Sequence, residues 1–257
     1  MESLLGVTFG QAAIILPLVF LAGFVDAVAG GGGLISLPGF IMSGLPIHYV
    51  IGTNKMSAFL GTSLATAKYI TNGYVPWRPA LAGMVFAMAG SSTGARAALY
   101  MDPVIFKTII LVVLPVTAIY VFCRKSIESE KPPFPEKKTI GLAMGIAFFL
   151  GLYDGFYGPG TGTFLLLLLT GIAHLKLTEA NGVTKVINWT TNAAALAVFL
   201  YHGTVMIPLG LLAGAFNVAG NYLGVKYFER NGAGSVKNLI LLVLVIFFAK
   251  TVYEIWG

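Results

Sequence analysis

Apolar segments long enough to cross a bilayer follow one another along almost the whole chain, with short polar turns between them. A spanning helix needs about 20 predominantly apolar residues. Backbone polar groups inside lipid must be paired within the protein, which favours helices. We therefore predict an all-α polytopic membrane protein. The expected segments are residues 9–29, 31–46, 49–72, 77–99, 103–122, 139–157, 161–174, 178–202, 204–227 and 236–256.

Two of these segments are shorter than a membrane-spanning helix. Residues 31–46 and 161–174 each follow a glycine-rich break. Both are expected to be half-spanning or re-entrant, because irregular backbone is tolerated in a membrane where it lines a cavity. The chain is therefore predicted to cross the membrane eight to ten times.

Composition agrees with this reading. Hydrophobic residues make up 57% of the chain and charged residues 10%, with a mean hydropathy of +0.85. An ordinary soluble domain has about a quarter charged residues. The net charge of +6 is explained by basic loops, and no basic stripe with stacking aromatics suggests nucleic acid.

The glycine breaks belong to a longer internal repeat. Asp26 matches Asp154 at an offset of 128 (154 − 26). Glycine is common in transmembrane helices, so the aligned charged positions carry the argument. Two homologous halves are predicted, residues 1–122 and 139–257. Further along, Gly52, Lys55, Gly73, Gly90, Gly94 and Lys107 match Gly182, Lys185, Gly203, Gly220, Gly224 and Lys237 at an offset of 130.

The polar stretch 123–138 separates the two halves and is predicted to be a cytoplasmic linker. Five of its residues are Lys or Arg, which the positive-inside rule places in the cytoplasm. Five crossings per half would make the repeats inverted, and four would make them parallel. We favour the inverted arrangement, although Lys107 would then lie near the outside.

The breaks themselves are candidate anion sites. A helix that restarts after a run of four glycines exposes unpaired N–H groups and the positive end of its dipole. Gly31, Gly32 and Gly33 supply such groups in the first half, and Gly160 and Thr161 in the second. The alternative is that these small residues only allow close helix packing.

Lys55 and Lys185 are the strongest candidates for binding an anion. Each lies in a Gly-x-x-Lys pattern ahead of an apolar run, and a lysine at mid-membrane costs about 2.5–3.5 kcal/mol on insertion scales. We expect both to contact the transported anion, with snorkelling to the interface as the alternative. The polar neighbours assigned to the same site are Thr53, Asn54, Ser57, Thr184 and Asn188.

Asp26 and Asp154 precede the two breaks and allow two interpretations. Each could couple transport to proton movement, or each could accept hydrogen bonds from the freed N–H groups of its broken helix. A third interpretation, an intramembrane aspartyl protease with a shared-proton pair, is disfavoured because the Gly-x-Gly-Asp pattern is missing.

Four motifs in order resemble the TauE/SafE family of sulfite and organosulfonate exporters. They lie at residues 23–33, 52–55, 153–162 and 180–188, and the resemblance covers about residues 10–255. It implies a bacterial inner-membrane permease for small sulfur-containing anions such as sulfite or sulfoacetate, in a branch without an assigned substrate. The resemblance also implies that the residues matching the family's motifs belong to its functional positions. These are Asp26, Gly30 to Gly33, Asn54, Lys55, Asp154, Gly158, Gly160, Lys185 and Asn188.

The resulting prediction is a multi-pass inner-membrane secondary transporter of small anions. It would work by alternating access around an anion site at the repeat interface. An anion channel is the main alternative, and an intramembrane enzyme is a weaker one. The expected partners are the anion and the lipid bilayer, a homodimer is compatible with the sequence, and no cofactor is expected. No metal site is expected either, because His48, His174 and His202 lack ligand-like spacing.

Overall fold

The computed structural model describes residues 6–102 and 132–231. These residues form eight α-helices and no strand, which confirms the predicted all-helical class. The expected segments 103–122 and 236–256 lie outside the described residues, as does the linker up to residue 131. The helices are α2 (Phe9–Ala29), α3 (Gly33–Ile41), α4 (Ile47–Thr71), α5 (Trp77–Tyr100), α7 (Glu136–Phe156), α8 (Thr161–Gly171), α9 (Leu177–Tyr201) and α10 (Ile207–Asn231).

The two segments that follow the glycine breaks form short helices. α3 has 9 residues and α8 has 11. At 1.5 Å per residue these helices are about 14 and 17 Å long, roughly half the hydrocarbon thickness of a bilayer. Neither can cross a membrane alone, so each break is followed by a half-length helix.

Two of the described helices are both long and apolar enough to cross a bilayer. They are α2 and α7, each with 21 residues, whose best windows have mean hydropathies of 2.3 and 1.5. The helices α4, α5, α9 and α10 have 24 or 25 residues, so they have the length but are less apolar. The reason is visible in α4 and α9, whose buried faces carry amide, hydroxyl and ammonium groups.

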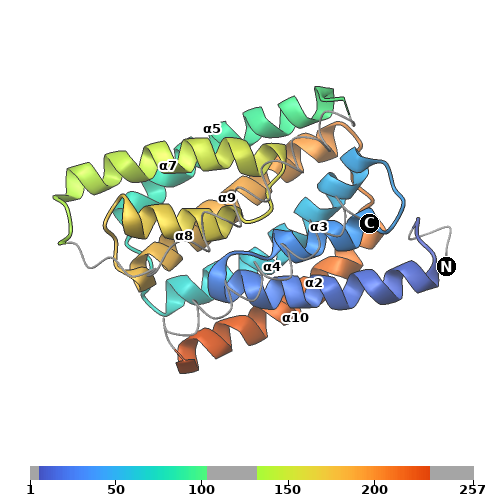
Figure 1. The fold of residues 1–257 in the computed structure, drawn as a ribbon, viewed down its shortest axis with the longest axis horizontal. Coiled ribbons are helices and arrows are strands. Elements are labelled where there is room, and N and C mark those ends of the chain that lie inside the picture. The colour runs from blue at the N-terminus through green and yellow to red at the C-terminus, as the bar shows by residue number, and fades with distance from the viewer. Residues whose placement is uncertain (1–5, 103–131, 232–257) are drawn as a thin grey trace, which may run out of the picture.

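The helices run roughly along the long axis of the molecule (Figure 1). α4 and α9 pack against each other in the middle, α2 and α10 form one edge, and α5 and α7 form the opposite edge. Along the colour gradient, α2 and α10 run in one direction, whereas α5 and α7 run in the other (Figure 1).

Glycines allow the backbones at the two edges to approach closely. A Cβ atom added at any of four glycines would lie 2.0 to 2.4 Å from a carbonyl oxygen of the neighbouring helix, a distance that no side chain can occupy. Small residues of this kind drive helix association in membranes. The contacts join Gly220 to Phe20, Gly224 to Phe24, Gly90 to Phe148 and Gly94 to Leu152.

Large apolar side chains point outward from the bundle. Val85 is 67% exposed and Phe149 is 68% exposed, and similar residues recur along α2 and α10. A soluble monomer rarely exposes extensive apolar surface. The exposed faces therefore suit contact with lipid, while the polar side chains of α4 and α9 are turned inward.

Candidate functional site

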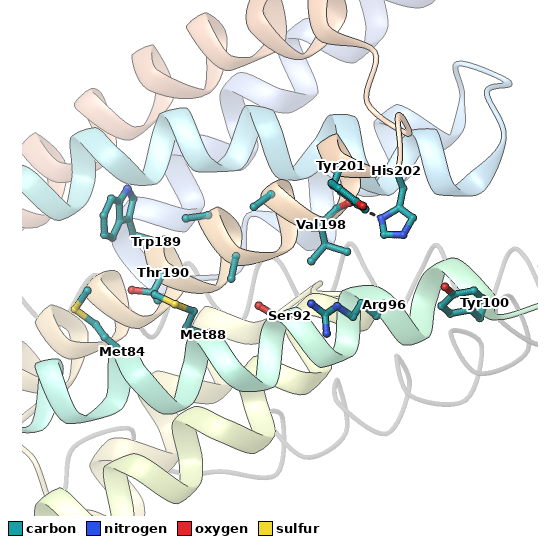
Figure 2. Close-up of a pocket in the computed structure, with 13 residues that line it drawn as sticks. Met84, Met88, Ser92, Arg96, Tyr100, Trp189, Thr190, Val198, Tyr201 and His202 are labelled. Atoms are coloured by element: carbon teal, nitrogen blue, oxygen red, sulfur yellow. Dashed lines mark hydrogen bonds between the residues drawn. The ribbon is translucent and has the colours of Figure 1, made fainter.

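A groove between α5 and α9 is the larger of two candidate sites. Its volume is about 740 Å³, and Figure 2 shows Arg96 and Ser92 projecting from α5 into the space beside α9. Ligand sites usually combine apolar walls with several convergent polar groups. Among the described residues that line this groove, Arg96 is the only Lys, Arg, Asp or Glu, and neither glycine break contributes to the wall.

A smaller, buried cavity lies where the two glycine breaks approach α4 and α9. Its water-accessible volume is about 30 Å³, enough for about two water molecules. Seven of the sequence-predicted site residues line it, namely Asp26, Gly32, Gly33, Asn54, Lys55, Asp154 and Asn188. Ala22, Gly30, Ser36, Ala58, Thr62, Gly158, Gly162, Asn192 and Asn217 complete the wall.

The two breaks touch each other directly. A Cβ atom added at Gly30 would lie 2.4 Å from the Gly162 carbonyl carbon, and one added at Gly162 would lie 2.5 Å from the Gly30 oxygen. The Thr163 amide donates to that Gly30 oxygen at 3.1 Å. Gly30 also has φ +76°, a conformation that costs other residues about 1–2 kcal/mol. Glycine is therefore required at the crossing of the two breaks.

Lys55 and Asp154 form a buried ion pair beside the second break. Lys55 Nζ lies 2.7 Å from Asp154 Oδ2, and both side chains are 3% exposed. The ammonium also donates to Asn192 Oδ1 at 3.4 Å. A lysine has three N–H donors, so one remains without a partner among the described residues. Lys55 also lines the cavity, with the Asp154 carboxylate against its ammonium.

Side chains from α4, α8 and α9 pair the backbone carbonyls at the end of α2. The last carbonyls of a helix commonly lack partners within it, and unpaired polar groups cost several kcal/mol in a membrane interior. Asp26 O accepts the Gly30 N–H at 2.9 Å and a side-chain donor as well. The end of α2 is thus held by tertiary contacts. The Lys185 ammonium donates to Asp26 O, Tyr69 Oη to Ala27 O at 3.0 Å, Asn181 Nδ2 to Val28 O at 3.2 Å and Thr163 Oγ1 to Ala29 O at 3.0 Å.

The carboxylate of Asp26 accepts hydrogen bonds from neutral groups. Asn188 Nδ2 donates to Asp26 Oδ1 at 3.4 Å, and the backbone N–H of Gly32 at the start of α3 also faces the carboxylate. Asp26 is 8% exposed and Asn54 is 6% exposed. Side-chain oxygens of both residues, Asp26 Oδ2 and Asn54 Oδ1, are buried without a hydrogen-bond partner. The cavity wall therefore contains polar atoms that a ligand could satisfy.

The N-cap residues of α3 and α8 are Gly32 and Gly160, which have no side chain to cap their helices. Thr161 Oγ1 instead donates to the Gly158 carbonyl at 2.7 Å. Uncapped N–H groups and the positive end of the helix dipole favour a negative charge nearby. Both helices start within two residues of a cavity-lining glycine, so their N-terminal ends add positive potential beside Lys55.

The other predicted site residues lie behind the cavity wall. Lys185 is fully buried against Asp26, and Thr53 Oγ1 accepts from the Met206 N–H at 3.0 Å. The hydroxyls of Ser57 and Thr184 are buried without a partner. Gly31, Gly160 and Thr161 belong to the breaks but do not line the cavity.

Asn192, Thr62 and Asn217 line the cavity but were missed in the sequence. Helical spacing could have found the first two. Lys185, Asn188 and Asn192 are separated by three and four residues, which places them on one face of a helix. The same spacing from Lys55 leads through Ala58 to Thr62. No motif marks Asn217, which reaches the cavity only because α10 packs against α2 and α4.

Comparisons with known proteins agree with these features. A protein of a Sinorhizobium species named "Probable membrane transporter protein ORF9" is 31% identical over 92% of this chain and 90% of the relative. A "Probable membrane transporter protein" of Haemophilus influenzae is 31% identical over 94% of both chains. The Escherichia coli K12 "Probable membrane transporter protein YfcA" is 27% identical over 97% of this chain and 96% of its own.

No solved structure matches the chain. The family model described as "Sulfite exporter TauE/SafE" matches residues 15–251. That match takes in both glycine breaks, the cavity and its charged residues. The chain belongs to the sulfite exporter TauE/SafE family.

Proposed function

We propose that this chain is a multi-pass inner-membrane transporter of small anions, with sulfite, organosulfonates or related sulfur oxyanions as the substrate class. One observation carries the proposal, namely the buried ammonium of Lys55 in the wall of a cavity where two broken helices meet. The family description and the names of the relatives support transport. Paired interrupted helices near mid-membrane are typical of transporter binding sites.

The electrostatics of the cavity favour an anion. A helix N-terminus contributes about half a positive charge, so the starts of α3 and α8 together supply about one. Lys55 adds a full charge, which the Asp154 carboxylate balances in the closed pair, and interactions between charges are stronger in a site removed from water. A charge-assisted hydrogen bond from Lys55 to an oxyanion would be worth about 1.5–3 kcal/mol.

The packing of the helices supports two inverted repeats around this site. The Gly220–Phe20 contact of α10 with α2 has its counterpart in the Gly90–Phe148 contact of α5 with α7. The partners differ by the sequence offsets of 130 (220 − 90) and 128 (148 − 20). The equivalent helices α2 and α7 run in opposite directions (Figure 1), as inverted repeats require. The cavity would then lie at the repeat interface.

Alternating access fits the closed cavity better than a channel does. A channel needs a continuous path, whereas here Gly30 and Gly162 are in contact and about 30 Å³ is accessible to water. In inverted-repeat transporters, one repeat rocks against the other around a fixed site. The contact between the two breaks is the natural place for such a movement.

Binding of purified protein to sulfite, sulfate, sulfoacetate, taurine and thiosulfate tests the proposal. Isothermal titration should detect at least one of these ligands. The double variant Lys55→Met/Asp154→Asn removes the cation without leaving a buried charge. It should bind about 30-fold more weakly than Asp154→Asn alone, as loss of a charge-assisted hydrogen bond predicts. The exposed Arg78→Ala is the control.

Two outcomes would contradict the proposal. Equal affinity in the two variants would place the anion away from Lys55, and failure of every ligand to bind would reject this substrate class. Vesicle assays separate the remaining alternatives, because a coupled carrier accumulates the anion against its gradient and a channel cannot. Chemical conversion of the ligand in detergent would instead indicate an enzyme.

A further inference from the structure

We infer that the Asp154 carboxylate occupies the place on Lys55 that the transported anion takes, so that each anion binds together with one proton on Asp154. The inference rests on the proposed function and names its coupling ion. Asp154 would act as an internal competitor of the substrate. Protonation of its carboxylate would free the lysine for the anion.

The geometry of the ion pair is that of an occupied anion site. Asp154 Oδ2 lies 2.7 Å from Lys55 Nζ, within the range for a charge-assisted hydrogen bond. Asn192 Oδ1 accepts a second hydrogen bond from the same ammonium at 3.4 Å. A Cβ atom added at Gly158, in the second break, would lie 2.9 Å from Lys55 Nζ and 3.0 Å from Asp154 Oδ1. The pair therefore lies directly against the backbone of the break.

The cavity has no room for a second anion beside that carboxylate. Its water-accessible volume of about 30 Å³ holds about two water molecules, whereas a sulfonate group brings four heavy atoms. An oxyanion can reach Lys55 only where the Asp154 carboxylate now lies. Binding therefore requires the carboxylate to leave the lysine, whatever larger opening movement accompanies it.

The charges of the ion pair and the anion balance if a proton takes part in this exchange. The closed pair carries one positive and one negative charge, with a sum of zero. If a monovalent anion replaced an ionised carboxylate, the site would hold one positive and two negative charges, which is costly away from water. If Asp154 takes up a proton from solvent, the sum is again zero. The exchange is Lys⁺·Asp⁻ + A⁻ + H⁺ → Lys⁺·A⁻ + AspH.

Asp154 carries this role rather than Asp26. The carboxylate of Asp26 faces Asn188 and the Gly32 amide, while Lys185 donates to the Asp26 carbonyl instead. Apart from Lys55, the charged groups around Asp154 are Asp26 across the cavity and Lys185 behind it.

Two other side chains next to the pair do not compete for its charge. The hydroxyl of Tyr153 donates to the Pro159 carbonyl at 2.7 Å, and Asn192 is neutral. Of the cavity-lining residues, Asp154 is thus the carboxylate in direct contact with an ammonium.

Proton uptake on anion binding tests the inference. The probes are sulfate, thiosulfate and ethanesulfonate, whose charges do not change between about pH 5.5 and 8.5. Isothermal titration in buffers of different ionisation enthalpy counts the protons. Wild-type protein should take up about one proton per anion and bind up to about tenfold more weakly per pH unit as pH rises. Asp154→Asn should take up no proton and should bind independently of pH. At pH 8 its affinity should be at least about ten times that of the wild type.

Asp26→Asn and Glu136→Gln are the matched variants. Glu136 lies on the same helix as Asp154 and pairs with Arg78 at the surface, so Glu136→Gln should behave as wild type. Asp26→Asn should retain the proton uptake.

The outcomes separate the inference from the proposed function. Anion binding through Lys55 without proton uptake, or uptake lost in Asp26→Asn and kept in Asp154→Asn, would overturn the inference and leave the function standing. Failure of all three probes and of the wider ligand panel to bind wild type and Asp154→Asn at every pH would reject the proposed function itself.

Discussion

The ammonium of Lys185 donates to the backbone carbonyl of Asp26, whereas the ammonium of Lys55 contacts the carboxylate of Asp154. The first contact satisfies the end of a broken helix, where a cation is favoured by the helix dipole. The second is an ion pair at the cavity wall. Two lysines in matching sequence positions therefore have different partners, and we expect their substitutions to have different effects.

Lys185→Ala should mainly lower stability. The change removes the charged one of two donors to Asp26 O, leaving the Gly30 N–H, and it removes a cation from the end of α2, at a cost of about 1–3 kcal/mol. Thermal unfolding of the purified protein in detergent measures it, with the exposed Lys176→Ala as control. Anion affinity should fall less than in the Lys55 variants. A large loss of affinity with unchanged stability would show that Lys185 itself contacts the anion, as the sequence predicted.

Lys55→Ala should destabilise the protein by leaving Asp154 buried without its cation. Breaking one side of a buried pair costs about 3–5 kcal/mol. Lys55→Ala/Asp154→Ala should recover most of that loss because no charge remains unpaired. A double-mutant cycle of unfolding free energies is the measurement. Strictly additive losses in the double variant would mean that the two side chains do not interact.

Gly30→Ala should prevent correct folding or abolish transport. The new methyl group would meet the Gly162 backbone at 2.4 Å, in addition to the strain of φ +76°. Gly44→Ala is the matched control, since Gly44 has φ +72° but nothing within 4 Å of the added Cβ. The control should cost only the backbone term of about 1–2 kcal/mol. Expression level and thermal unfolding compare the two, and similar behaviour would argue against the crossing contact.

Gly94→Ala and Gly141→Ala should change stability in opposite directions. A Cβ at Gly94 would lie 2.0 Å from the Leu152 oxygen of the neighbouring helix, whereas one at Gly141 would meet nothing within 4 Å. Overpacking at Gly94 should cost about 1–3 kcal/mol. Gly141→Ala should stabilise α7 by about 0.5–1 kcal/mol, the usual gain for alanine within a helix. Unfolding midpoints in detergent check both signs.

Cys123 tests the predicted cytoplasmic linker, because it is the only cysteine in the sequence. It precedes the basic residues of 124–138, which the positive-inside rule places in the cytoplasm. A membrane-impermeant maleimide should label it in inside-out vesicles and leave it unlabelled in intact cells. Labelling from the outside of intact cells would reverse the topology.

The sequence alone located the helices with small errors. Residues 9–29 match α2 in full, and 49–72 and 178–202 match α4 and α9 within two residues at each end. Apolar length between turn residues is a local property, so it can be read without the fold. The short segments were predicted to extend to residues 46 and 174, but α3 ends at Ile41 and α8 at Gly171. Helix ends depend on contacts beyond the local sequence.

The repeat offsets and buried lysines pointed to the charged residues near the breaks, but tertiary structure decided which of them meet. Aligned sequence positions made Lys55 and Lys185 equivalent. The packing of α4 and α9 then gave one lysine a carboxylate and the other a carbonyl. Partners 99 and 159 residues apart are chosen by how whole helices cross. The sequence therefore determined the helices and their polar residues, because these follow from solvent and local geometry. Only the tertiary structure determined the pairs, because burial and distance belong to the assembled bundle.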